Sequence, residues 1–281
     1  MYYYILDTHG IPQKDFERNQ TELQGLLTEL NINGEMARVT PLRIIQDLVD
    51  TASNRGATTL IACGTDQTFN QMLASIKEHE FTLGFVPFVP DTQLGRILGV
   101  KDVQTAARTI ASRRTERIDA AKINNQFFIS YLELGLGQYT NKEIGMFSLM
   151  KLFAANPVEL KMRIDDSYVI TSKVMGALIV NTRGTRSHVD SPIGNPQDGY
   201  LDLLLLEHMG KFGAIKNKQE ITSGFYEKIP GATSMRCKKI EILEPANHKI
   251  YIDGMEMFKV PSIIEIVPNK FRMIVGKDRV F

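Results

Sequence analysis

The sequence predicts two domains: an N-terminal three-layer α/β domain with a parallel sheet, and a β-sandwich-like C-terminal domain. Apolar runs alternate with helical patterns over residues 1–117, whereas runs rich in Val, Ile and Tyr, separated by turn residues, dominate residues 118–276. A length of 281 residues also suits about two domains of ordinary size. The charged stretch Arg113–Arg117 marks the expected boundary.

The N-terminal elements follow from short apolar runs and helical periodicity. Strands are expected at residues 2–6, 58–63 and 81–88, and helices at 15–30, 41–56, 68–76 and 102–110. Thr40-Pro41 predicts an N-cap followed by proline at the first helical position, Gly56 predicts the end of that helix, and Asp102 predicts the cap of the last one. Strands separated by helices need crossover connections, so the sheet is expected to be parallel.

The C-terminal region carries little helical pattern. Strands are expected at residues 127–134, 167–182, 200–207, 235–243, 248–252, 260–267 and 271–275, with one helix near 141–153. This succession of strands predicts the sandwich-like domain.

Composition excludes several classes of protein. The net charge of +1 gives no global attraction to nucleic acid, and no nucleic-acid partner is expected. No apolar run approaches the ~20 residues that span a bilayer, so a cytoplasmic protein is expected. Cys63 and Cys237 fit neither a disulfide framework nor a zinc site. Three lysines in 211–218 predict a solvated loop, with peripheral contact at an anionic membrane as the alternative.

Two segments follow neighbouring strands of the predicted parallel sheet, where ligands bind in such folds. In residues 63–71, Gly64 permits close approach of a phosphate and Asp66 could hold Mg²⁺. The segment alone favours a plain turn, with Asp66 or Thr68 as helix cap. In residues 83–93, the favoured interpretation is a rigid connector capped by Asp91. His9 follows the first strand and is expected at the same cleft.

Two acidic turns lie in the second half of the chain. Asp198 and Asp202 flank an Asp-Gly turn, which favours turn chemistry and leaves a hard cation as the alternative. Asp253-Gly254 reads first as a hairpin turn, and Asp253 with Glu256 forms the functional alternative, a general base and its neighbour.

Taken in order, these segments resemble the diacylglycerol kinase and sphingosine kinase family. Residues 64–71 align with the family loop G-G-D-G-T-x-N-E, and residues 83–88 with its L-G-I-I-P-L strand. Residues 94–100, 119–128 and 191–202 align with later elements, and Asp253-Gly254 with the late D-G-E. The resemblance covers nearly the whole chain.

The resemblance implies a nucleotide domain and a lipid-binding domain, with residues 277–281 returning to the first. It also implies phosphorylation of a lipid hydroxyl that depends on ATP and Mg²⁺, with Asp253 and Glu256 as catalytic residues. The implied metal ligands are Asp66, Asp198 and Asp202. The implied nucleotide contacts are His9, Gly64, Thr65, Asp66, Gln67, Thr68 and Asn70.

Four family elements are altered. Thr65 and Gln67 replace loop glycines, residues 89–93 replace G-T-G-N-D, the N-P-x-S-G stretch is reduced to residues 8–10, and Met255 stands third in the late motif. Two hypotheses therefore stay open: a lipid kinase with an unusual loop, and an inactive homologue that binds a lipid, a nucleotide or a protein. A small-molecule kinase like the NAD kinases is a third, which the 198–202 element disfavours.

Overall fold

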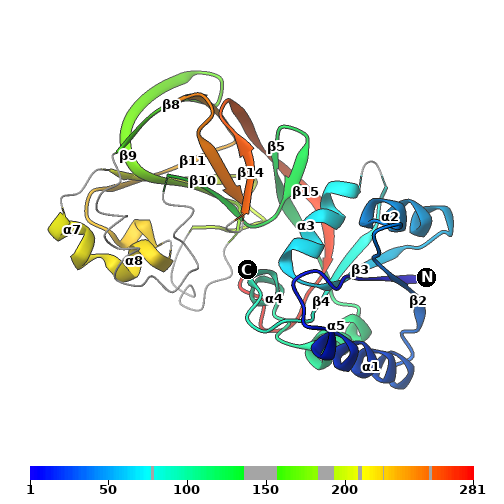
Figure 1. Ribbon diagram of the computed structural model, residues 1–281. Helices are drawn as coiled ribbons and strands as arrows, with labels where there is room; N and C mark the ends of the chain where they lie inside the picture. Colours follow the sequence, from blue (N-terminus) through cyan, green and yellow to red (C-terminus); the bar gives the residue numbers. More distant parts are fainter. Residues whose placement is uncertain (77–78, 136–156, 183–192, 208–210, 224, 253–254) are drawn as a thin grey trace.

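The computed structural model describes residues 1–281 except 77–78, 136–156, 183–192, 208–210, 224 and 253–254 (Figure 1). The helix expected near 141–153 lies outside the described residues. The N-terminal elements are β1 (Tyr2–Leu6), α1 (Gln13–Glu29), β2 (Gly34–Arg38), α2 (Ile45–Asn54), β3 (Thr59–Gly64), α3 (Asp66–Ser75), β4 (Thr82–Pro87), α4 (Gln93–Leu98) and α5 (Val103–Ser112).

The N-terminal sheet is parallel, as predicted. Its order is β2-β1-β3-β4, and the end of β15 (Ser262–Ile274) joins β4 in parallel as well. Helices α1 and α5 pack together on one face, whereas α2 and α3 pack on the other (Figure 1). The domain therefore has the three expected layers.

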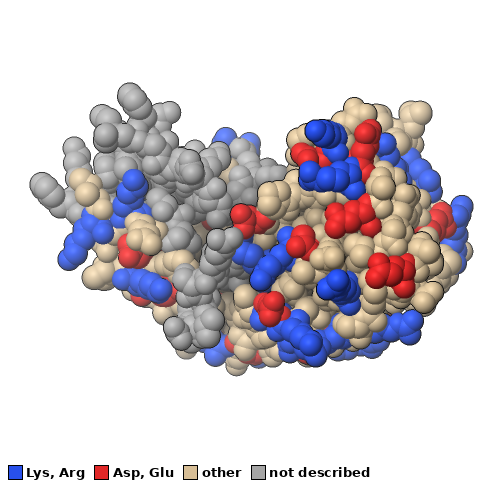
Figure 2. All heavy atoms as spheres, turned by 90° about the horizontal axis from the view of Figure 1, so that it is seen from below, with Lys and Arg blue, Asp and Glu red and all other residues tan. Residues whose placement is uncertain are grey.

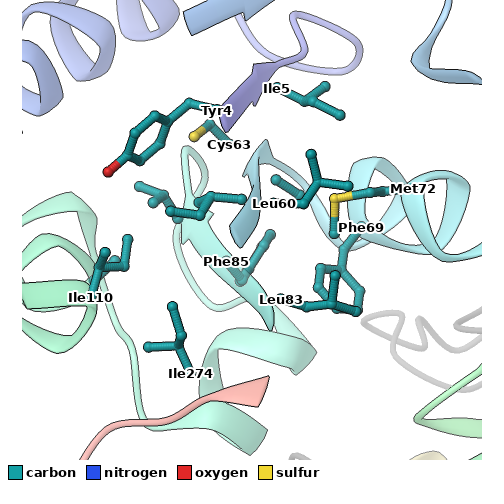
Figure 3. Close-up of a cluster of buried hydrophobic side chains, with 14 of the residues drawn as sticks. Tyr4, Ile5, Leu60, Cys63, Phe69, Met72, Leu83, Phe85, Ile110 and Ile274 are labelled. Carbon is teal, nitrogen blue, oxygen red and sulfur yellow. The ribbon is translucent and has the colours of Figure 1, made fainter. Parts of the chain in front are cut away.

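Apolar side chains of the central strands fill both spaces between sheet and helices. Tyr4, Leu60 and Leu83 are fully buried, and the rings of Phe69 and Phe85 meet edge to face at 6.0 Å (Figure 3). Strands buried on both faces read as nearly continuous apolar runs, which is why β1, β3 and β4 were recognisable in the sequence.

Two long strands connect the domains. β5 (Thr115–Ile123) leaves the first domain, and β15 returns to it, and the two pair antiparallel from Thr115↔Ile274 to Ile123↔Ile264 (Figure 1). After β15 the chain stays with the first domain, because the N–H of Gly276 donates to the carbonyl of Leu98 at 2.7 Å and that of Val280 to Ile97 at 3.2 Å.

The C-terminal domain is β-sandwich-like, as predicted. Its strands are β6 (Gln126–Phe128), β7 (Tyr131–Leu134), β8 (Val158–Ile164), β9 (Tyr168–Val180), β10 (Leu201–Glu207), β11 (Ala232–Cys237), β12 (Lys239–Glu244), β13 (Lys249–Ile252) and β14 (Met255–Lys259). Short helices α7 (Lys211–Lys216), α8 (Lys218–Ser223) and η2 (Tyr226–Lys228) follow β10.

The leucine-rich strand β10 is buried on both faces. Leu203 and Leu205 belong to the large core of the domain, whereas Leu204 and Leu206 join a second cluster that includes Ile229 beyond η2. A strand covered on both sides needs no polar alternation, so consecutive leucines are stable here.

Several expected elements differ from the structure. The strand β2 was missed because it is polar, with Ala37 as its one buried residue. The predicted cap at Thr40 is wrong: α2 begins at Ile45, where the N–H of Ile44 donates to Asp47. The connector at 89–93 leads into a short helix, α4, whose cap is Thr92 rather than Asp91.

Three strand predictions were also wrong in their boundaries. The strand expected over 127–134 is divided into β6 and β7. The strand expected over 235–243 is divided into β11 and β12, because the Asp165 carboxylate accepts the N–H groups of Lys238 and Lys239 and turns the chain between them. Conversely, 260–267 and 271–275 form one strand, β15, with an irregularity between Val267 and Phe271.

Charge is mixed on the surface of the N-terminal domain. Figure 2 shows acidic and basic side chains interspersed over the face in view. Among the described residues, no helix is long and apolar enough to cross a membrane.

Candidate functional site

The turn between β3 and α3 is a tightly capped helix start. Thr65 has extended backbone at φ −105°, and its hydroxyl accepts the N–H of Thr68, while the Thr68 hydroxyl accepts the N–H of Thr65 at 3.1 Å. A Cβ at position 64 would lie 2.4 Å from the Thr68 hydroxyl oxygen. A side chain at position 64 would therefore collide with Thr68, so a contact within the protein explains this glycine.

The Thr68 hydroxyl also ties this turn to the end of β1. It donates to the Asp7 carboxylate at 2.9 Å, and the second oxygen of that carboxylate accepts the N–H of His9 at 3.0 Å. Thr68 is fully buried and Asp7 is 4% exposed. Thr68 was expected as a phosphate contact, but its hydroxyl is already used in holding β1 and α3 together.

Asp66 reaches across to the start of α4. One carboxylate oxygen accepts the N–H of Gln93 at 2.8 Å and the other accepts that of Leu94 at 2.9 Å. Burial raises the pKa of Asp66, and the two backbone N–H groups oppose that rise. The carboxylate therefore sits where an anion would bind a helix start.

A pocket of about 550 Å³ opens beside these groups. It lies at the carboxyl ends of β1, β3 and β4, where ligands bind in open α/β sheets. Its lining residues are His9, Gly10, Thr65, Asp66, Gln67, Val89, Pro90, Asp91, Thr92, Gln93 and Arg96. The pocket thus brings together the expected residues 9, 65, 66 and 67. Asn70 is buried in α3 and is not among the lining residues.

The basic group of this pocket is held by its own neighbour. The Arg96 guanidinium donates to the carbonyl of Asp91 at 2.7 Å and lies 4.0 Å from its carboxylate. The lining contains two acidic residues, Asp66 and Asp91, and two basic residues, His9 and Arg96. The pocket therefore carries no large positive potential that would attract a polyphosphate.

Asp198 and Asp202 share a cation supplied by the protein. Arg236 forms ion pairs with both, and the N–H of Gly194 donates to Asp202 at 2.7 Å. Within the described ranges, no group of three or more His, Cys, Asp or Glu side chains could hold a metal ion. The metal role expected for Asp66, Asp198 and Asp202 stays a prediction, and each carboxylate already has protein donors.

The expected catalytic pair cannot be placed. Asp253 lies outside the described residues. The backbone of Glu256 in β14 pairs with Tyr251 in β13, but the side chain of Glu256 also lies outside the described part of the structure.

Sequence reasoning missed two structural acids. Asp7 is one, and its signal was an acid directly after an apolar strand. The other is Asp119, which is 1% exposed. Its carboxylate accepts the N–H groups of Gly199 at 2.7 Å and Asn269 at 2.8 Å. Asp119 was noted as part of the crossing between domains, but its partners lie 80 and 150 residues away.

The fold and the pocket define a class of protein: an α/β domain with a ligand pocket at the carboxyl edge of its sheet, joined by two strands to a β-sandwich-like domain. Two family models match this arrangement. The diacylglycerol kinase catalytic domain matches residues 7–123, and the YegS C-terminal NAD kinase beta sandwich-like domain matches residues 138–275. The chain therefore belongs to the diacylglycerol kinase family.

Individual relatives agree with this assignment. The chain is 24% identical over 246 residues to "Putative lipid kinase SAS0691" of Staphylococcus aureus, which covers 78% of this chain and 77% of that protein. Two solved structures from Bacillus anthracis have the same fold. One, titled as a putative diacylglycerol kinase, has a TM-score of 0.79 at 20% identity over 99% of this chain and 96% of that one. Another, titled as a diacylglycerol kinase, has a TM-score of 0.77 at 18% identity, covering 99% and 98%.

Proposed function

We propose that this chain is a non-catalytic member of the diacylglycerol kinase family, which binds a lipid in its C-terminal domain and does not transfer phosphate from MgATP. The observation that carries the proposal is the position of the Asp66 carboxylate on the N–H groups of Gln93 and Leu94. Phosphoryl transfer depends on donors that are preorganised for the phosphates, and here the protein fills that place itself.

The donor inventory of the two helix starts supports the proposal. In α4, the N–H groups of Gln93 and Leu94 are used by Asp66 and that of Gly95 by the Thr92 hydroxyl. Pro90 has no N–H to offer. In α3, the N–H of Thr68 is used by Thr65. Among the described residues of these two helix starts, the N–H groups of Asp66, Gln67 and Thr92 have no protein acceptor, and all three residues line the pocket.

The side chains at 65 and 67 support it further. Both line the pocket, at the positions where the loop of the diacylglycerol kinase family has glycine. Neither residue has a positive φ, so the loop keeps the geometry of an ordinary helix start rather than one that only glycine adopts. A phosphate would meet side chains before it reached the backbone.

The lipid part of the proposal is supported by the matched family and by the description of the relatives as lipid kinases. Peripheral membrane contact is part of the same proposal. Ile215 in α7 is 57% exposed, and Lys216 and Lys218 beside it are exposed as well. An exposed apolar side chain next to cations is typical of a segment that touches an anionic bilayer.

MgATP binding and turnover test the catalytic half. Calorimetry with MgATP is expected to give no binding heat for the wild type, and a panel of diacylglycerol, monoacylglycerol and sphingosine is expected to give no phosphorylated product. The double variant Thr65→Gly/Gln67→Gly restores the glycines of the family loop and is expected to gain MgATP binding. Glycine is tolerated as an N-cap, so this variant should remain folded.

Lipid binding tests the other half. Organic extracts of the purified protein, analysed by mass spectrometry, are expected to contain a co-purified lipid. Flotation with anionic vesicles is expected for the wild type and is expected to weaken for Ile215→Asp. A protein free of lipid that also fails to float would contradict this half while leaving the catalytic half standing.

One observation favours the second candidate, an active lipid kinase. The pocket of about 550 Å³ is within the size range of ligand sites, and the first two N–H groups of α3 remain available to an anion. In that case turnover would require Asp253. Lipid phosphorylation by the wild type that Asp253→Asn abolishes would establish the kinase and overturn the first proposal.

A further inference from the structure

A second pocket lies at the opposite end of the N-terminal sheet. Its volume is about 300 Å³, and it sits where β4 begins, beside the connecting strands β5 and β15. Its lining residues are Thr58, Ile76, His79, Glu80, Phe81, Thr82, Leu83, Arg117, Lys270, Phe271 and Arg272. Phe81, Leu83 and Phe271 are buried and form its apolar part.

The lining of this pocket is strongly basic. Arg117, Lys270 and Arg272 bring three permanent positive charges, and Glu80 is the one acid among the lining residues. The contrast with the whole chain, whose net charge is +1, shows that the basic character is local. A concave site with an excess of one charge attracts ligands of the opposite charge.

Two of these cations face each other across a strand pair. Arg117 in β5 and Arg272 in β15 are direct cross-strand partners, so their side chains lie on the same face of the sheet. Like charges in this position repel and destabilise the pair. Elsewhere on the same two strands the charges are matched: Lys122 is the cross-strand partner of Glu265, at 3.3 Å. The facing arginines depart from this matching, and a bound anion would compensate the repulsion between them.

No protein carboxylate supplies that anion within the described part of the chain. Arg117 donates to the neutral carbonyl of Asn269 at 3.2 Å, and no ion pair is formed there by Arg272. The Lys270 ammonium lies over two rings, 5.0 Å from Phe127 and 5.7 Å from Phe271. Arg117 and Arg272 are exposed, so a ligand can reach them from solvent.

We propose that Arg117, Lys270 and Arg272 form a binding site for a phosphate-type oxyanion, separate from the pocket at the carboxyl edge. Two guanidinium forks match the oxygens of a phosphate, and Lys270 adds a point charge. Thr82 is a further polar residue of the same lining. The bound anion would join β4, β5 and β15, which are the strands at the junction of the two domains. The phosphate could be that of a soluble phosphomonoester or of a lipid headgroup, which share this chemistry.

The test uses the full chain with inorganic phosphate and glycerol 3-phosphate as soluble probes. Calorimetry is expected to show binding to the wild type, and phosphate is expected to raise its melting temperature. The double variant Arg117→Gln/Arg272→Gln is expected to bind at least about tenfold more weakly, since each arginine supplies charge-assisted hydrogen bonds. Arg18→Gln, an exposed arginine of α1 paired with Asp15, is the matched control and should bind like the wild type.

Vesicles distinguish the source of the phosphate. This arm uses the Ile215→Asp background, in which the membrane contact proposed for α7 is removed. Flotation of Ile215→Asp, but not of Ile215→Asp combined with Arg117→Gln/Arg272→Gln, with phosphatidic acid in phosphatidylcholine assigns the site to a lipid headgroup. Soluble binding without such flotation assigns it to a free phosphomonoester. The proposal is overturned if neither probe binds, if binding survives in the double variant, or if Arg96→Gln in the first pocket abolishes it instead. None of these outcomes depends on whether the chain turns over MgATP.

Discussion

The pockets at the two ends of β4 differ in how their charges are balanced. At the carboxyl end, Asp66 is held by two backbone N–H groups and Arg96 by Asp91. At the amino end, Arg117 faces Arg272 across the strands. The family loop lies at the first end, yet the second end offers the more open positive charge. In this chain, therefore, the position of a pocket in the fold does not by itself indicate where unpaired positive charge lies.

Removal of the Asp66 side chain is expected to have the largest effect on the stability of the protein. We expect Asp66→Ala to lower the free energy of unfolding by about 2–3 kcal/mol, because the N–H groups of Gln93 and Leu94 lose a charged acceptor. Urea unfolding measures this loss. The matched control is Asp15→Ala, whose carboxylate is 42% exposed and paired with Arg18, and which should cost well under about 1 kcal/mol. Equal losses in the two variants would contradict the structural role of Asp66.

The buried hydroxyl at position 68 gives the next effect. Thr68→Val keeps the shape of the side chain and removes the donor to Asp7 and the acceptor for the N–H of Thr65. We expect a loss of about 1–2 kcal/mol in thermal or urea unfolding, since Asp7 is buried and its carboxylate then keeps, among the described residues, the His9 N–H alone. Thr28→Val on the exposed face of α1 controls for the substitution itself. A Thr68 variant as stable as that control would show that the hydroxyl is not needed there.

Two arginines lie in opposite electrostatic environments, because Arg236 is paired with acids and Arg272 faces another arginine. Arg236→Gln removes the shared partner of Asp198 and Asp202 and is expected to cost about 1 kcal/mol, reduced by the exposure of the arginine. Arg272→Gln removes a cross-strand repulsion and is expected to stabilise the protein by about 0.5 kcal/mol. Both are measured by urea unfolding in low-salt buffer without phosphate. Destabilisation of similar size in both variants would refute the contrast.

The smallest effect is the pH dependence that Asp66 contributes. Its pKa is raised above 3.8 in the folded state, so the folded chain binds more protons than the unfolded chain just above that pH. The wild type therefore loses stability relative to Asp66→Asn as the pH rises from 3.8 through the raised pKa, and the difference is constant at higher pH. Unfolding of both proteins from about pH 4 to pH 7 measures it. A wild type that instead gains stability relative to Asp66→Asn as the pH rises would indicate that a cation stabilises the carboxylate.

Short-range patterns were enough to predict much of the fold. The runs around Tyr4, Leu60 and Leu83 are buried on both faces, and so the strands of the parallel sheet could be recognised without the structure. The cap at Asp102 was confirmed, because a helix cap is a contact between residues three apart. The strand β2 and the helix α4 were missed because a polar edge strand and a six-residue helix carry little periodicity.

Local sequence patterns were sufficient to predict the alternation of elements, the sandwich-like second half and the ordered motifs that resemble the diacylglycerol kinase family. The contacts that those motifs make depend on the tertiary structure. Asp66 meets N–H groups 27 and 28 residues away, and Arg117 meets Arg272 through the register of two strands at the domain junction. Local patterns record which face of an element is buried, whereas the partner of a charged group depends on how distant strands and helices are placed beside one another.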